Sequence, residues 1–191
     1  GRRQDTLGQV TLVSSLFHER WPYGGDDPAL LLFTRALEAW HMLIEPGMRI
    51  LEIGCCETDL ARRLLKVEPT LEIVGVDVRE APEYAEADVT FLQGDINAQA
   101  FESASFDAVI SLGAIEHIGL GHYGDPRDER GDQSCMVNVA KWLKPGGWLY
   151  YDVPFQPGEG VYVSPDGCWR AYGMEFLPRA KGLHLKQRAW D

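Results

Sequence analysis

A chain of 191 residues, 45% of them hydrophobic, is long enough to bury one core, so a single globular domain is expected. Its formal net charge of −11 disfavours the phosphate backbone of nucleic acids as a partner. The sequence holds no apolar run of about 18 residues, no secretory signal pattern and no C-x-x-C pair, so we expect a soluble, cytoplasmic protein with reduced thiols.

The first part of the chain favours helices. A weak helical pattern runs from Gln9 to Arg20 and is followed by turn-forming residues. Apolar residues then recur at helical spacing from Asp26 or Asp27, either of which can cap the helix, as far as residues 46–47. We therefore expect residues 1–48 to form an N-terminal helical segment that packs on the sheet of residues 49–191.

After residue 48, short apolar runs alternate with amphipathic segments. Such runs predict buried strands, and the segments between them predict helices. This alternation is typical of an α/β fold with a doubly wound, mostly parallel sheet. The expected strands are 49–53, 71–78, 89–92, 106–111 and 148–153, with helices over 58–66 and 133–143, then a loop or hairpin over 158–168, a short helix over 174–181 and a last strand over 182–190.

The end of the first expected strand carries features of a nucleotide site. Glu52 and Gly54 lead into a tight turn, and the following helix starts at Thr58. A glycine turn lets the backbone approach a ligand, and the N–H groups at a helix start face it. Asp77 follows Gly54 by 23 residues, close to the spacing of about 20 at which an acid binds ribose hydroxyls in βαβ units.

Five segments in order resemble the class I S-adenosylmethionine-dependent methyltransferases. The resemblance implies their Rossmann-like fold, a mostly parallel sheet of seven strands with an antiparallel last strand. The residues after Val153 match only loosely, which leaves open whether that strand belongs to this chain or the chain stops after the sixth. The segments are Glu52-Ile53-Gly54, Val76-Asp77-Val78, Gln93-Gly94-Asp95-Ile96, Phe106 to Ser111 with Ile115-Glu116-His117, and Leu143-Lys144-Pro145-Gly146-Gly147.

The resemblance implies S-adenosyl-L-methionine as cofactor and S-adenosyl-L-homocysteine as product. One departure concerns the glycines of the first turn, where Cys56 and Thr58 stand in place of the second and third. Cysteine is small and threonine is a good helix N-cap, so the turn can stay tight. The expected cofactor-binding residues are Glu52, Gly54, Cys55, Cys56, Asp77, Val78, Gly94, Asp95, Ile96 and Ser111.

The loop after the fourth expected strand is the predicted acceptor site. Residues 115–126 resemble a poorly characterised methyltransferase-like family with an IEH-IGLG-YGDP signature. Such a loop lies above the carboxyl ends of the strands, where ligands bind in open α/β sheets. We expect His117 or His122, with Asp125, to position or deprotonate the acceptor. The sequence leaves the choice between the two histidines open.

A metal-dependent version of this site is disfavoured. Metal-dependent RNA 2′-O-methyltransferases carry a Glu-x-x-Glu-His cluster on this loop, and here Gly113 occupies the first glutamate position. Glu116, His117, His122 and Asp125 would be the remaining ligands. We therefore predict no metal.

The function predicted from the sequence is methyl transfer to an oxygen or nitrogen of a small-molecule or sugar-like acceptor. A degenerate fold that serves as a binding or scaffold protein is the main alternative, motivated by the altered glycines. A nicotinamide-dependent oxidoreductase is disfavoured, because the chain lacks Tyr-x-x-x-Lys and a G-x-G-x-x-G sequence at residue 54. The acceptor and the oligomeric state are left open.

Overall fold

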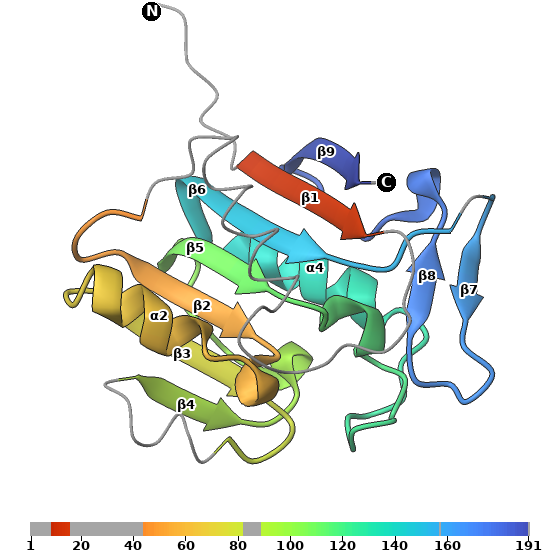
Figure 1. Cartoon of the computed structure of the whole chain (residues 1–191), viewed down its shortest axis with the longest axis horizontal. Coiled ribbons are helices and arrows are strands. Elements are labelled where there is room, and N and C mark those ends of the chain that lie inside the picture. The colour runs from red at the N-terminus through yellow and green to blue at the C-terminus, as the bar shows by residue number, and fades with distance from the viewer. Residues whose placement is uncertain (1–8, 16–43, 82–88, 157, 191) are drawn as a thin grey trace, which may run out of the picture.

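A computed structural model describes residues 9–15, 44–81, 89–156 and 158–190 (Figure 1). Its main sheet contains β1 (Gln9–Ser15), β2 (Arg49–Ile53), β3 (Glu72–Asp77), β4 (Thr90–Gln93), β5 (Phe106–Ser111), β6 (Leu143–Asp152) and β9 (His184–Trp190). The strand order is β4-β3-β2-β5-β6-β1-β9, and every neighbouring pair is parallel. The predicted doubly wound α/β sheet is confirmed.

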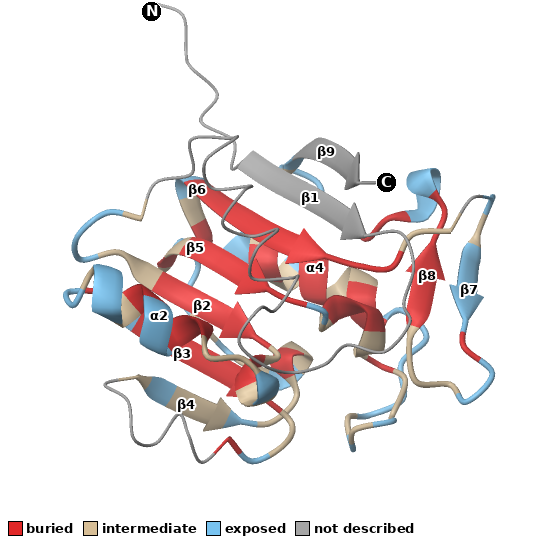
Figure 2. Ribbon diagram, viewed as in Figure 1, coloured by how far each residue is buried: buried red, intermediate tan, exposed pale blue. Residues whose placement is uncertain are grey.

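Helices cover both faces of this sheet. The α-helices α2 (Leu60–Val67) and α4 (Gly131–Trp142) lie on opposite sides (Figure 1). Alternate residues of β2 belong to different halves of the core, because successive strand side chains point to opposite faces. Ile50 packs in the cluster that contains α2, and Leu51 in the cluster that contains α4. Figure 2 shows the central strands buried along their length.

The N-terminal segment differs from its helical prediction. Gln9–Ser15 is the strand β1, which pairs with β6 on one side and β9 on the other. The β-branched residues Val10, Thr11 and Val13 favour this conformation. A position between two strands also lets the backbone N–H and C=O groups on both edges of β1 form hydrogen bonds. The helix predicted from Asp26 or Asp27 lies outside the described residues.

The C-terminal part fills the rest of the sheet. The predicted last strand is confirmed as β9, but it runs parallel to β1. β1 and β9 are therefore the sixth and seventh strands in the spatial order of the sheet, counted from β4. None of the described strands of this sheet is antiparallel to its neighbours.

Between β6 and β9, residues 161–172 form a hairpin, one of the two alternatives predicted for residues 158–168. The strands β7 (Val161–Val163) and β8 (Arg170–Tyr172) pair antiparallel. The helix predicted over 174–181 shrinks to the 3₁₀ turn η4 (Met174–Phe176). Pro178 accounts for this, because proline lacks the N–H that a continuing helix needs. In the described ranges, no helix is both long and apolar enough to cross a bilayer.

Candidate active site

The site lies where the strand order reverses. β2 is flanked by β3 on one side and by β5 on the other, and such a switch point leaves a crevice at the carboxyl ends of the strands. A cavity of about 410 Å³ opens there. Its walls include Gly54 after β2, Asp77 at the end of β3, Asp95 after β4, and Glu116 with His117 after β5.

The turn after β2 requires glycine. Gly54 has φ 78°, in the left-handed region, and a Cβ there would lie 2.3 Å from the Cβ of Ala114. Its N–H donates to the carbonyl of Val76, 2.9 Å away, which joins the turn to β3. The tight turn predicted from the sequence is confirmed, and it brings backbone to the floor of the cavity.

Asp77 is buried at the end of β3 and lines the cavity. Its Oδ2 accepts from the N–H of Cys56 at 3.0 Å, and its Oδ1 accepts from the N–H and the Nε of Arg79 at 2.9 and 3.2 Å. Arg79 also pairs with Glu57 at 2.7 Å and lies 4.5 Å from the ring centroid of Tyr123. Asp77, the predicted ribose-binding acid, therefore forms an ion pair with Arg79, a cavity residue that the sequence reasoning did not predict.

Glu52 is 2% exposed and does not line the cavity, although the next two residues of the chain, Ile53 and Gly54, do. Burial raises the pKa of its carboxyl from 4.5 to about 8, although a hydrogen bond from the hydroxyl of Thr58 acts in the opposite direction. Thr58 uses its hydroxyl for this contact, and the N-cap of α2 is Asp59, so the prediction that Thr58 caps the helix is wrong.

The other predicted cofactor residues divide into two groups. Val78, Gly94, Asp95 and Ile96 line the cavity, and Asp95 also caps the 3₁₀ helix η2 (Ile96–Ala98) by accepting from the N–H of Asn97 at 3.0 Å. Outside the lining lie Cys55 and Ser111, which are fully buried, and Cys56, whose N–H contacts Asp77.

The loop of residues 115–126, predicted to bind the acceptor and called the acceptor loop below, places one histidine in the cavity. His117 ends the 3₁₀ helix η3 (Ile115–His117), and its Nδ1 lies 2.5 Å from the carbonyl oxygen of Cys168. Because a carbonyl can only accept, Nδ1 carries the proton and Nε2 is the basic nitrogen. His122 is exposed, packs against Tyr123 with ring centroids 4.8 Å apart, and does not line the cavity.

Asp125 shapes the same loop. Its Oδ2 accepts from the N–H groups of Gly119 and Gly121, at 2.6 and 3.3 Å. The residue also lines the cavity, and its Oδ1 is buried without a hydrogen-bond partner among the described residues.

Glu116 is a site residue that the sequence reasoning considered only as a metal ligand. It is 2% exposed and lines the cavity, and its Oε1 lies 3.9 Å from Nε2 of His117. Burial, and secondly the nearby Asp152, raise the pKa of its carboxyl well above the usual range. Across the described ranges, no three His, Cys, Asp or Glu side chains form a group that could hold a metal ion.

The hairpin β7–β8 holds the acceptor loop in place. Arg170, 3% exposed, donates to the carbonyl oxygens of Ile118, Glu116 and Glu129 at 2.7, 3.3 and 3.5 Å. The preceding residue, Trp169, lines the cavity. Residues about 50 positions beyond η3 therefore complete its wall, a contact that no local pattern in the sequence could reveal.

Comparison with known proteins gives the family. A family described as "Caenorhabditis protein of unknown function, DUF268" matches residues 63–173. An uncharacterised methyltransferase of Mycobacterium tuberculosis is 34% identical over 145 residues, covering 74% of this chain and 68% of that protein. The sterol 24-C-methyltransferase ERG6B of Gibberella zeae is 29% identical over 157 residues, covering 73% of this chain and 38% of that protein.

A solved structure agrees with these relatives. Phosphoethanolamine N-methyltransferase 2 of Haemonchus contortus, in complex with S-adenosyl-L-methionine, has a TM-score of 0.53 and 26% identity, covering 75% of this chain. The chain spans only 31% of that protein, and 53% and 49% of two other solved structures that it matches. The chain therefore belongs to the DUF268 family and to the class I S-adenosylmethionine-dependent methyltransferases.

Proposed function

We propose that this chain transfers a methyl group from S-adenosyl-L-methionine to an oxygen or nitrogen atom of a small-molecule or sugar-like acceptor. One observation carries the proposal: a single cavity is lined both by the turn after β2 with Asp77 and by the η3 loop with His117. Donor and acceptor must meet in one space for direct transfer.

The residues around Gly54 fit the cofactor of this family. The Gly54 turn admits a ligand close to the backbone, Asp77 offers a carboxylate to ribose hydroxyls, and Asp95 with Ile96 borders the adenine end. Glu52 adds a buried carboxyl two residues before this turn. When bound, the cofactor supplies an electrophilic methyl group on a sulfonium sulfur.

The acceptor end fits a nucleophile that must lose a proton. Oxygen and nitrogen acceptors give up a proton as they are methylated, and His117 offers a basic Nε2 at the cavity wall. Asp125 holds the glycine turns of the loop and so positions that wall. A role for His122 stays a prediction, since its ring is exposed.

Calorimetric titration with S-adenosyl-L-homocysteine tests the proposal. We expect wild-type protein to bind it and Asp77→Ala to weaken binding about tenfold or more, because a charged acceptor of two hydroxyl donors is lost. Glu102→Ala, which removes an exposed carboxylate outside the cavity lining, is the control and should bind like wild type. No binding by folded wild-type protein would instead favour the scaffold alternative.

A further inference from the structure

Two acidic side chains in the cavity have oxygen atoms without partners. Glu116 Oε2 and Asp125 Oδ1 are buried and receive no hydrogen bond from the residues that the structure describes. Both side chains line the cavity, and Glu116 is 2% exposed. Buried carboxyl oxygens are normally hydrogen-bonded, so these two indicate a ligand that brings N–H or O–H donors.

The charges around the cavity distinguish between such ligands. Five of its described lining residues are carboxylic acids, namely Glu57, Asp77, Asp95, Glu116 and Asp125. Arg79 is its one lining arginine or lysine among the described residues, and it already pairs with Asp77 and Glu57. A carboxylate or phosphate on the acceptor would therefore meet like charge, whereas a cation would meet opposite charge.

We infer that the methyl acceptor is a primary or secondary amine, bound as an ammonium group whose N–H donors reach Glu116 and Asp125. This inference rests on the proposed function and narrows its acceptor to nitrogen. Tyr123 and Trp169 line the same cavity and supply aromatic surface for the rest of the amine. An alcohol has one donor and no charge, so it satisfies this pair of oxygens less well.

The state of Glu116 agrees with a cationic ligand. Without one, burial and secondly Asp152 raise the pKa of the Glu116 carboxyl well above its usual range, which favours the protonated form. An ammonium group beside it favours the ionised form, so amine binding releases a proton. During transfer the ammonium gives a proton to the Glu116 carboxylate, which passes it to Nε2 of His117, 3.9 Å from Oε1, and from there to water. The nitrogen lone pair forms the new N–C bond, and the methyl–sulfur bond breaks with its electron pair left on sulfur.

The test compares amines with matched alcohols. Protein saturated with S-adenosyl-L-homocysteine is titrated with 2-phenylethylamine and 2-phenylethanol, and separately with butylamine and 1-butanol. We expect at least one amine to bind about tenfold more tightly than its alcohol, with proton release seen as a difference in heat between two buffers. Equal affinities in both pairs, tighter alcohol binding, or no amine binding up to 10 mM (roughly the weak-binding limit) would overturn the inference.

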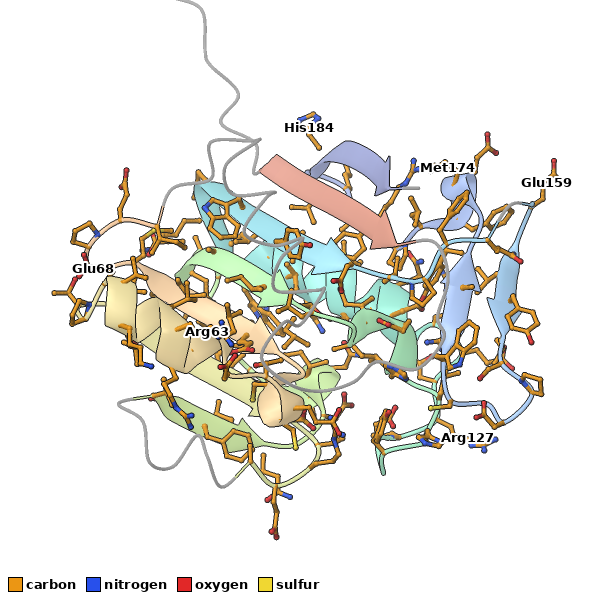
Figure 3. All side chains as sticks on the ribbon, in the orientation of Figure 1. Arg63, Glu68, Arg127, Glu159, Met174 and His184 are labelled. Carbon is orange, nitrogen blue, oxygen red and sulfur yellow. The ribbon has the colours of Figure 1, made fainter. Side chains whose placement is uncertain are left out.

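Variants of Glu116 and Asp125 test whether these two carboxyls cause the preference for amines over alcohols. Glu116→Gln should reduce the amine preference to within about threefold of parity, and Asp125→Asn should reduce it as an independent second variant. Glu159→Gln, at an exposed residue beside β7 (Figure 3), is the control and should keep the wild-type preference. If wild-type protein binds S-adenosyl-L-homocysteine but shows no preference for amines, only this inference is wrong. If wild-type protein does not bind S-adenosyl-L-homocysteine at all, the proposed function is wrong.

Discussion

Gly54 combines a backbone angle and a close contact that together exclude a side chain. A left-handed conformation costs an alanine about 1–2 kcal/mol, and the contact of 2.3 Å with Ala114 adds overlap between two packed elements. We predict that Gly54→Ala lowers the free energy of unfolding by more than about 2 kcal/mol. It should also weaken S-adenosyl-L-homocysteine binding. Urea denaturation and calorimetry measure the two effects.

Gly146 is the matched control for this substitution. It has a similar φ of 84°, but its Cβ position has no neighbouring atom within 4 Å. Gly146→Ala should therefore lose only the conformational part, about 1–2 kcal/mol, and keep the ligand affinity of wild type. Equal effects of both substitutions on ligand binding would show that the Gly54 contact has no role in shaping the cavity.

Glu52 should make stability depend on pH. Its pKa is raised from 4.5 to about 8 in the folded state, so the folded protein holds a proton that the unfolded chain releases. The resulting stability is fully present below pH 4.5 and is lost as the pH rises towards 8. We predict that Glu52→Gln is more stable than wild type at about pH 8, with the difference shrinking by at least about 1 kcal/mol at about pH 5.

Urea unfolding at several pH values measures this difference. Glu102→Gln alters an exposed carboxylate and should leave the pH profile of wild type unchanged. A Glu52→Gln profile parallel to that of wild type would mean that the Glu52 carboxyl titrates alike in the folded and unfolded chains.

Arg79 competes with any ligand for the carboxylate of Asp77. Its side chain contacts both oxygens, at 3.2 and 3.4 Å, while its backbone N–H also donates to Oδ1. Arg79→Met removes only the side-chain contacts, so we predict S-adenosyl-L-homocysteine binding up to about fivefold tighter, the scale of a partly exposed ion pair. Weaker binding, measured by calorimetry, would mean instead that Arg79 supports the ligand directly.

Sequence reasoning predicted the cofactor residues from short motifs, and most of those residues line one cavity. Gly54 and Asp77 could be predicted from a turn and a spacing, and both line the cavity. Arg79 and Trp169 could not, since their places depend on contacts between separate loops. Thr58 was assigned to a helix cap because threonine often caps helices, but a buried carboxyl supplied a stronger partner.

At the scale of elements, the acceptor loop depends on the hairpin that packs against it. Arg170 satisfies carbonyl oxygens of η3 and of the following loop from a nearly fully buried position. We predict that Arg170→Met lowers the free energy of unfolding by about 2–4 kcal/mol, because buried carbonyls lose their charged donor. Hydrogen exchange should show faster exchange of the amides of residues 115–125.

Arg179→Met is the control for this prediction. Arg179 is exposed and donates at 3.0 Å to the carbonyl of Met174, which Figure 3 labels. Its loss should change stability by less than about 0.5 kcal/mol. Unchanged exchange in the loop of Arg170→Met would show that other contacts hold η3 in place.

Elements were predictable where burial imposed a clear pattern. The strands over 49–53 and 106–111 are apolar runs covered on both faces, and the structure gives these bounds. β1 was missed, because residues 9–20 were interpreted as one weak helix despite the β-branched residues of Gln9–Ser15, and no local pattern reveals the pairing with β6 and β9. The segment over residues 174–181 failed as a helix for the local reason of Pro178.

For the whole molecule, ligand binding should be linked to unfolding. The cavity is lined by the loops after β2, β3, β4 and β5 and by Trp169 of the β7–β8 hairpin, so a ligand there joins loops from both sides of the switch point. S-adenosyl-L-homocysteine at about a hundred times its Kd should raise the free energy of unfolding by about 2.7 kcal/mol in one transition. Asp77→Ala should show little of this shift at the same concentration, and a separate unliganded transition would contradict a single cooperative unit.

The position of β1 has a consequence during synthesis. This strand is synthesised well before both strands that pair with it, β6 starting at Leu143 and β9 ending at Trp190. Its backbone stays unpaired until those strands follow, and such distant contacts close slowly. The nascent chain therefore carries an unpaired strand of a kind that invites aggregation, and chaperone binding to it should fall once β9 has been made.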